Sequence, residues 1–114
     1  MPYLSIQTNQ AINEDKIDAL LKKTSHAVAE ILGKPESYVM TALQDNTPMS
    51  FAGNSDPAAY VQLKSLGLPE SSTTDFSQAI CSLVSSELGI SADRIYIEFS
   101  GPDRHMWGWN NKTF

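Results

Sequence analysis

The residue with the clearest chemical potential in this chain is Pro2, which directly follows the initiator methionine. Met1 in front of a small residue is normally removed, which would leave Pro2 as a secondary amine at the N-terminus. A free α-amino group has a reference pKa of about 7.7–8.0, and burial lowers that pKa because it disfavours the charged form. Such an amine can act as a general base near neutral pH. The competing interpretation is that Pro2 only begins an edge strand.

Composition excludes several classes of function. The chain has 114 residues, of which 41% are hydrophobic and 18% charged, as is typical of one ordinary globular domain. The net charge is −5 and the eight lysines and arginines are scattered, so we expect no nucleic-acid partner and no membrane partner. No apolar run approaches the roughly 20 residues that span a bilayer, and the first residues do not resemble a signal peptide. We expect a cytoplasmic protein, and release without a signal peptide stays open.

The residue types that usually bind metals are isolated in this sequence. Cys81 is the single cysteine, so it cannot form an internal disulfide, and it has no Cys or His neighbour at the spacing of metal ligands. We therefore expect no metal site and no cofactor, with Cys81 packed in the core.

The spacing of apolar residues predicts two long helices. Between residues 14 and 32 the apolar residues recur at i, i+3, i+4 and i+7, with Asn13 as an N-cap and Gly33 as the end. The same pattern over residues 73–88 follows a run of Ser and Thr that can cap a helix, and it ends at Gly89.

The runs between the helices predict four strands, at Tyr3 to Thr8, Val39 to Gln44, Ala59 to Leu63 and Ile95 to Phe99. The glycines that end the helices lie 89 − 33 = 56 positions apart, close to half of the chain. We therefore expect a single domain over residues 1–114 with pseudo-repeats at about 2–50 and 58–114. Two βαβ units merge into an α+β fold, a four-stranded mixed sheet with two helices on one face. We expect the other face to be apolar and uncovered, which favours an oligomer.

Two further segments carry apolar residues on backbone rich in turn formers. Asp45 to Pro57 joins the two halves and includes Met49 and Phe51, which predicts a structured loop and not a flexible linker. The tail from Ser100 holds three large aromatic residues, Trp107, Trp109 and Phe114. Aromatic side chains on turns often line a pocket or a subunit interface, and the alternative is a cap over the edge of the core.

Several short motifs, taken in order, resemble one family over the whole chain. They are the initial Met-Pro, Gly33-Lys34-Pro35 with Tyr38 shortly after, Ser65-Leu66-Gly67, the segment Asp93 to Ile97, and the final WGWNNKTF. This combination is similar to the macrophage migration inhibitory factor family of the tautomerase superfamily. The resemblance implies a homotrimer of βαβ repeats whose sheets line a central channel, with active sites between neighbouring subunits.

The resemblance also implies residues for keto–enol exchange in a phenylpyruvate-like aromatic α-keto acid. Pro2 would be the general base, Lys34 would bind the substrate carboxylate beside Ser65 and Leu66, and Tyr96 would enter from the adjacent subunit. Aromatic positions of the pocket wall are matched by Tyr38, Trp109 and Phe114. The reaction needs a base, a cation for the carboxylate and a donor at the oxygen where charge develops, and these residue types suit it. Taken alone, Lys34 would be a lysine at a helix C-terminus and Tyr96 a core aromatic of a strand.

Three residues depart from the pattern of the family. Glu98 stands where well-known animal members have Asn. An anion near the site would raise the pKa of Pro2, so we expect weaker activity or a shifted pH optimum. Trp107 replaces a smaller aliphatic residue and Tyr3 replaces the Met of some members, so we expect a narrower pocket mouth.

Two classes of function remain open on the sequence. The first is a phenylpyruvate-type tautomerase, which requires a trimmed Pro2 of low pKa. The second is a cytokine-like, partner-binding protein with weak or vestigial tautomerase activity, which has no such requirement. A decarboxylase or dehalogenase, as found elsewhere in the superfamily, usually needs additional arginines. The chain offers only Arg94 and Arg104.

Overall fold

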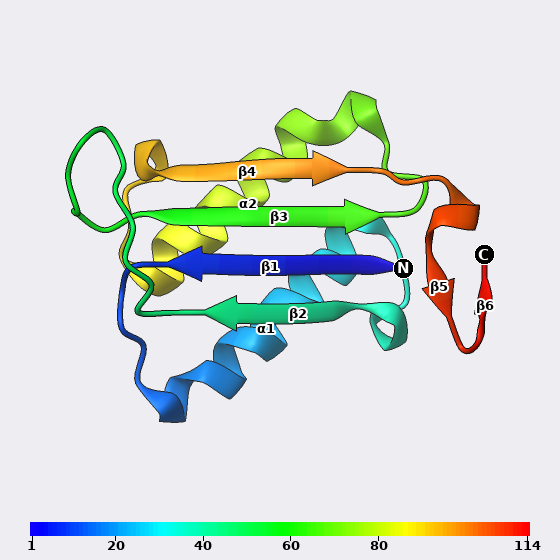
Figure 1. The fold of residues 1–114 in the computed structure, drawn as a ribbon, viewed down its shortest axis with the longest axis horizontal. Helices are drawn as coiled ribbons and strands as arrows, with labels where there is room; N and C mark the ends of the chain where they lie inside the picture. Colours follow the sequence, from blue (N-terminus) through cyan, green and yellow to red (C-terminus); the bar gives the residue numbers. More distant parts are fainter.

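A four-stranded mixed sheet with two helices on one of its faces forms the bulk of the structure, a computed structural model that describes residues 1–114 (Figure 1). The strands are β1 (Pro2–Thr8), β2 (Met40–Gln44), β3 (Ala59–Ser65) and β4 (Ile95–Ser100). Their order in the sheet is β2-β1-β3-β4. The central strands β1 and β3 are antiparallel, and each is parallel to its outer neighbour. The predicted α+β fold is confirmed.

The helices begin and end where the apolar spacing predicts, at Glu14–Leu32 (α1) and Thr73–Leu88 (α2). Gly33 and Gly89 follow them in the left-handed conformation, with φ of 63° and 67°, which glycine adopts without steric cost. The predicted N-cap positions are confirmed. Asn13 and Ser72 occupy the N-cap positions, but neither side chain makes a capping hydrogen bond.

The core lies between the helices and the sheet. Alternate residues of β1 and β3 face the helices and are buried, among them Leu4, Ile6, Val61 and Leu63. Cys81 of α2 is half-buried and packs against this cluster. Neither helix combines the length and the apolar character needed to cross a membrane.

The sheet face that the helices leave open is not apolar, and that prediction is wrong. The side chains that alternate with the core residues are largely polar, and they include Ser5, Gln7, Gln62, Lys64 and Glu98. Ser5 and Gln62 share a hydrogen bond, and Gln7 donates one to Gln44. The period of two in the strands separates a buried apolar face from a polar one, as it does in a sheet that one helical layer covers.

The remaining segments lie at opposite ends of the sheet (Figure 1). The tail forms a 3-10 turn (Arg104–Met106) and a small hairpin of β5 (Gly108–Trp109) and β6 (Lys112–Thr113), beyond the end at which β1 begins. The loop between the halves lies at the other end. The guanidinium of Arg94 donates to backbone oxygens of this loop at Phe51, Asp56 and Pro57, which gives the loop a defined structure.

Candidate functional site

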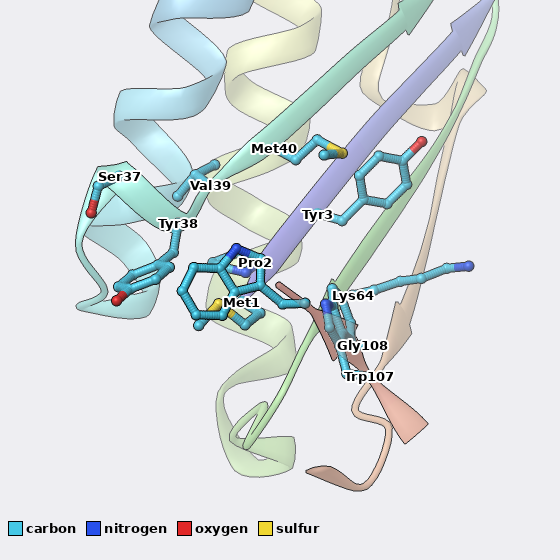
Figure 2. Close-up of a pocket in the computed structure, with 11 residues that line it drawn as sticks. Met1, Pro2, Tyr3, Ser37, Tyr38, Val39, Met40, Lys64, Trp107 and Gly108 are labelled. Carbon is cyan, nitrogen blue, oxygen red and sulfur yellow. The ribbon is translucent and has the colours of Figure 1, made fainter. Parts of the chain in front are cut away.

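A pocket of about 460 Å³ lies where β1 begins (Figure 2). Four segments that are distant in the sequence form it: the first residues of the chain, the connection from a 3-10 turn (Glu36–Tyr38) into β2, the end of β3, and the C-terminal hairpin with the residue before it. Its lining is mostly apolar or aromatic and consists of Met1, Pro2, Tyr3, Ser37, Tyr38, Val39, Met40, Lys64, Trp107, Gly108 and Trp109. A concave, largely apolar site with a few polar groups is typical of small-molecule binding.

Pro2 is buried at the first position of β1, opposite Ser65 of β3. The interpretation of Pro2 as the start of an edge strand is wrong, because β1 is a central strand. Proline is tolerated as the first residue of a strand, where its missing N–H breaks no run of ladder bonds. The sheet therefore fixes Pro2 against one side of the pocket.

The start of the chain lies among positive charges. Burial lowers the pKa of the Met1 amino group, and the charges of Lys34 and Arg104 lower it further. Lys34 directly follows the glycine that ends α1, and its Nζ donates to the backbone oxygen of Leu66 at 2.5 Å. Two cations beside a partly buried amine favour the neutral amine and attract an anion.

Aromatic rings form the outer wall of the pocket. Tyr38 and Trp109 meet edge to face with ring centroids 6.0 Å apart. Trp109 stacks on Phe114 at 5.8 Å, and the backbone N–H of Phe114 donates to the oxygen of Trp107 at 3.2 Å. Such pairs fix the hairpin against the turn that carries Tyr38, because each contact orients two rings.

The structure brings most of the sequence-predicted site residues to this end of the sheet. Pro2, Tyr38, Trp107 and Trp109 line the pocket, together with Tyr3. Others lie directly behind the lining: Phe114 stacks on Trp109, and Leu66 accepts the Lys34 bond. Ser65 is fully buried, and its Oγ donates to the same Leu66 oxygen at 3.3 Å.

Tyr96 and Glu98 do not reach Pro2 within one chain. Tyr96 opposes Tyr60 in β3, whereas Pro2 opposes Ser65. At about 3.3 Å per residue, five positions along the strand correspond to roughly 17 Å. The Tyr96 side chain is 65% exposed and packs on Phe51 with ring centroids 4.8 Å apart.

Glu98 belongs to a hydrogen-bonded group on the open face of the sheet. Its Oε1 accepts from the Tyr60 hydroxyl at 2.5 Å and from Gln62 Nε2 at 2.9 Å. The bond from Gln62, followed by the bond from Tyr60, lowers the pKa of Glu98. In turn, the bond to this carboxylate raises the pKa of Tyr60.

Sequence reasoning missed several residues at the pocket, among them Ser37, Val39, Met40 and Lys64 in the lining. Arg104, which sequence reasoning could not assign to a carboxylate anchor, lies close enough to the N-terminus to lower the pKa of its amine. The available signal for Lys64 was the alternation in β3, which places it on the open face beside Tyr3. The pairing register that sets Lys64 next to Tyr3 is not encoded in any local motif.

The chain is similar in sequence and in structure to one family of known proteins. The model described as macrophage migration inhibitory factor matches residues 1–114. A macrophage migration inhibitory factor homolog of Brugia malayi is 39% identical over 116 residues, which cover 100% of this chain and 99% of that relative. The macrophage migration inhibitory factor of Rattus norvegicus is 31% identical over 115 residues, with coverage of 100% and 99%.

The fold agrees with solved structures of such proteins. The homologue from Prochlorococcus marinus superposes with a TM-score of 0.92 at 45% identity, over 98% of each chain. The protein from Trichinella spiralis gives a TM-score of 0.90 at 33% identity, over 98% of this chain and 99% of that one.

Proposed function

Since the chain belongs to the macrophage migration inhibitory factor family of the tautomerase superfamily, we propose that it is a keto–enol tautomerase of phenylpyruvate-like aromatic α-keto acids. Pro2 is its general base. The observation that carries the proposal is that the start of the chain opens into an aromatic-lined pocket beside two cations. No cofactor enters this reaction, which moves one proton between the carbon next to the keto group and the keto oxygen.

Removal of Met1 makes the nitrogen of Pro2 the amino group in the pocket. Burial and the charge of Lys34, which lower the pKa of the Met1 amine, act on Pro2 in the same direction. Toward the enol, the neutral amine takes the proton from the carbon next to the keto group, and the keto oxygen gains a proton. Toward the keto acid, the oxygen loses its proton and the protonated amine returns one to the carbon. A base whose pKa lies near the working pH serves best in both directions.

Lys34 and the aromatic wall orient the substrate. The Lys34 ammonium can bind the substrate carboxylate while it keeps its bond to the Leu66 oxygen, because an ammonium has three donors. The substrate ring would lie against Tyr38 and Trp109, which both line the pocket and contact each other edge to face. Trp107 narrows the same opening and disfavours bulky rings.

We further propose a homotrimer in which each site is completed by the Tyr96 of the adjacent subunit. Tyr96 is 65% exposed, and the open sheet face that carries it is uncovered in the single chain. Its hydroxyl would donate to the oxygen on which charge develops, a role that general acids and oxyanion donors share. The trimer acts in the cytoplasm, where a single unpaired cysteine is suited to reducing conditions.

The test is the steady-state rate of phenylpyruvate tautomerisation by the purified protein and by a Pro2→Gly variant. Glycine also permits removal of the initiator Met, so the variant keeps an N-terminal amine but not a secondary one. We expect a loss of about two orders of magnitude or more, the scale of general base catalysis. Pro48→Gly, in an exposed loop, is the matched control and should be unaffected. Equal activity of Pro2→Gly and the parent would refute the role of Pro2.

The similarity to macrophage migration inhibitory factors favours one alternative, a cytokine-like protein that binds a partner through its surface. Intact mass separates the two proposals at low cost. A retained Met1 blocks the secondary amine and leaves only the partner-binding alternative, whereas a mass that lacks Met1 meets the first condition of catalysis.

A further inference from the structure

Only one of the two oxygens of the Glu98 carboxylate accepts hydrogen bonds within the chain. Both Tyr60 and Gln62 donate to Oε1, and no hydrogen bond in the chain reaches Oε2. The two donors come from β3, so the carboxylate is held in one orientation on the open sheet face. The lowered pKa of Glu98 means that this oxygen carries negative charge at neutral pH.

Lys64 is the complementary group on the same face. It is the only charged side chain that lines the pocket, and it forms no salt bridge or side-chain hydrogen bond within the chain. Its own Glu98 is a diagonal neighbour, since Lys64 opposes Ser100 and Glu98 opposes Gln62. Figure 2 shows the Lys64 side chain extending away from Pro2 and Trp107, out from the sheet.

We propose that Lys64 Nζ binds Oε2 of Glu98 of the partner subunit, so that each pocket of the oligomer contains a cross-subunit ion pair at its mouth. The inference rests on the proposed trimer. Glu98 lies two residues after Tyr96 on the same face of β4, so a subunit that brings its Tyr96 to a Pro2 pocket brings its Glu98 with it. Because Lys64 and Glu98 are different positions of one surface, the contact is head-to-tail and can close into a ring.

The pair removes the electrostatic conflict that Glu98 creates. An unpaired carboxylate at the pocket mouth would repel the substrate carboxylate and stabilise the protonated form of Pro2. The other titratable or charged groups that face Pro2 are Tyr3 and Tyr38 in the lining, with Lys34 and Arg104 beside the chain start. In the ion pair, the Lys64 ammonium neutralises the charge of the Glu98 carboxylate. The groups around Pro2 then keep their net positive charge.

Zero-length carbodiimide coupling tests the pair in the unmodified protein, since this reagent joins a carboxylate only to an amine in contact with it. Protein with ordinary nitrogen and protein labelled with ¹⁵N are mixed by joint refolding, cross-linked and digested for mass spectrometry. We expect a peptide that joins Lys64 to Glu98, with about half of it carrying mixed labels, as contacts between subunits require. Glu98→Gln and Lys64→Gln proteins should lack this peptide.

Three results would contradict the proposal, and they can be told apart. Same-label peptides alone would place the pair within one chain and overturn the proposal, as would absence of the peptide in a protein that sediments as a trimer. A monomeric mass would overturn both this pair and the intersubunit site.

The pH dependence of kcat/KM provides a second test. Each variant is first shown by sedimentation to have the mass of the trimer. Lys64→Gln should move the acidic limb of kcat/KM to higher pH, because the unpaired Glu98 then favours protonated Pro2. The double variant Lys64→Gln/Glu98→Gln should return the limb toward its original position. A double variant that is no closer to the parent than Lys64→Gln would contradict the pairing.

Discussion

At the scale of single residues, the position of Pro2 is consistent with its proposed role as the general base. The residue is buried at the first position of a central strand, where the sheet holds its backbone in place and the residue lines the pocket. Burial and Lys34 both lower the pKa of an amine at the start of this chain. In a chain without Met1, we propose that the same burial and charge act on the Pro2 nitrogen.

Lys34 has two separable roles in this account, and a Lys34→Gln substitution tests both. Loss of the charge should raise KM for phenylpyruvate and move the acidic limb of the pH–rate profile to higher pH, since Pro2 then protonates more readily. A hydrogen bond to a charged group is worth about 1.5–3 kcal/mol, so kcat/KM should fall by roughly 10- to 100-fold.

The matched control is Lys22→Gln, which removes an exposed lysine from α1. Steady-state kinetics over pH would measure both variants. A Lys34→Gln protein with unchanged KM and an unchanged profile would exclude Lys34 from the site.

At the scale of elements, the pairing of β3 with β4 builds the carboxylate group of the open face. Tyr60 and Gln62 lie two positions apart in β3, and both reach the same Glu98 oxygen on β4. Cross-strand neighbours of this kind are the contacts that stabilise a sheet. The same bonds lower the pKa of Glu98 and raise the pKa of Tyr60.

This geometry predicts an unusual pKa for Tyr60. Because the bond to the Glu98 carboxylate raises the pKa of Tyr60, this ring should ionise at higher pH than in a Glu98→Gln protein. The pKa of Glu98 is lowered, so the bond should persist at neutral pH and weaken only on acidification through that pKa. Ring-carbon NMR of ¹³C-labelled tyrosine during a pH titration would measure this. Identical Tyr60 titrations in the two proteins would show that the bond does not form.

The helices illustrate what local sequence can predict. The repeat of apolar residues every three to four positions and a glycine at the end are properties of one segment, so the bounds of α1 and α2 follow from the sequence. Asn13 occupies the N-cap position that its residue type predicts, but its side chain makes no capping hydrogen bond, because such a bond also depends on the rotamer.

The pocket illustrates what local sequence cannot predict. Pro2 and the tail aromatics were inferred from their residue types and Lys34 from the resemblance, yet Lys64 and Met40 enter the lining through strand pairing. Register depends on contacts between distant segments, as does the identity of the face that helices cover. The open face was expected to be apolar because the strands were taken to have two populated faces, and the polar residues that alternate along them show otherwise.

At the scale of the whole molecule, two similar halves make one sheet. β1 and β3 share the same alternation of buried and half-buried residues, and they lie antiparallel at the centre. We propose on this basis that residues of about 2–50 and 58–114 are pseudo-repeats within the single domain. The pocket forms at one end of the sheet, and Tyr96 lies toward the other. A single chain thus separates the groups that the reaction needs, and assembly would unite them.

Mixing two inactive variants tests whether each site takes Pro2 from one chain and Tyr96 from another. In a trimer with sites between subunits, Pro2→Gly chains still supply Tyr96 and Tyr96→Ala chains still supply Pro2. Joint refolding of equal amounts should restore about a quarter of the parental activity, the fraction of sites that combine both intact residues. Each variant refolded alone is the control. Activity that stays at the average of the two separate variants would mean that a site draws on one chain only.

The central claim is that Pro2 is an N-terminal amine with a lowered pKa, and ¹⁵N NMR titration of its nitrogen measures this most directly. We expect a mature chain without Met1 and a Pro2 pKa below the reference range of about 7.7–8.0, rising toward that range in Lys34→Gln. A Pro2 nitrogen that titrates within or above that range, or that is blocked by a retained Met1, would contradict it.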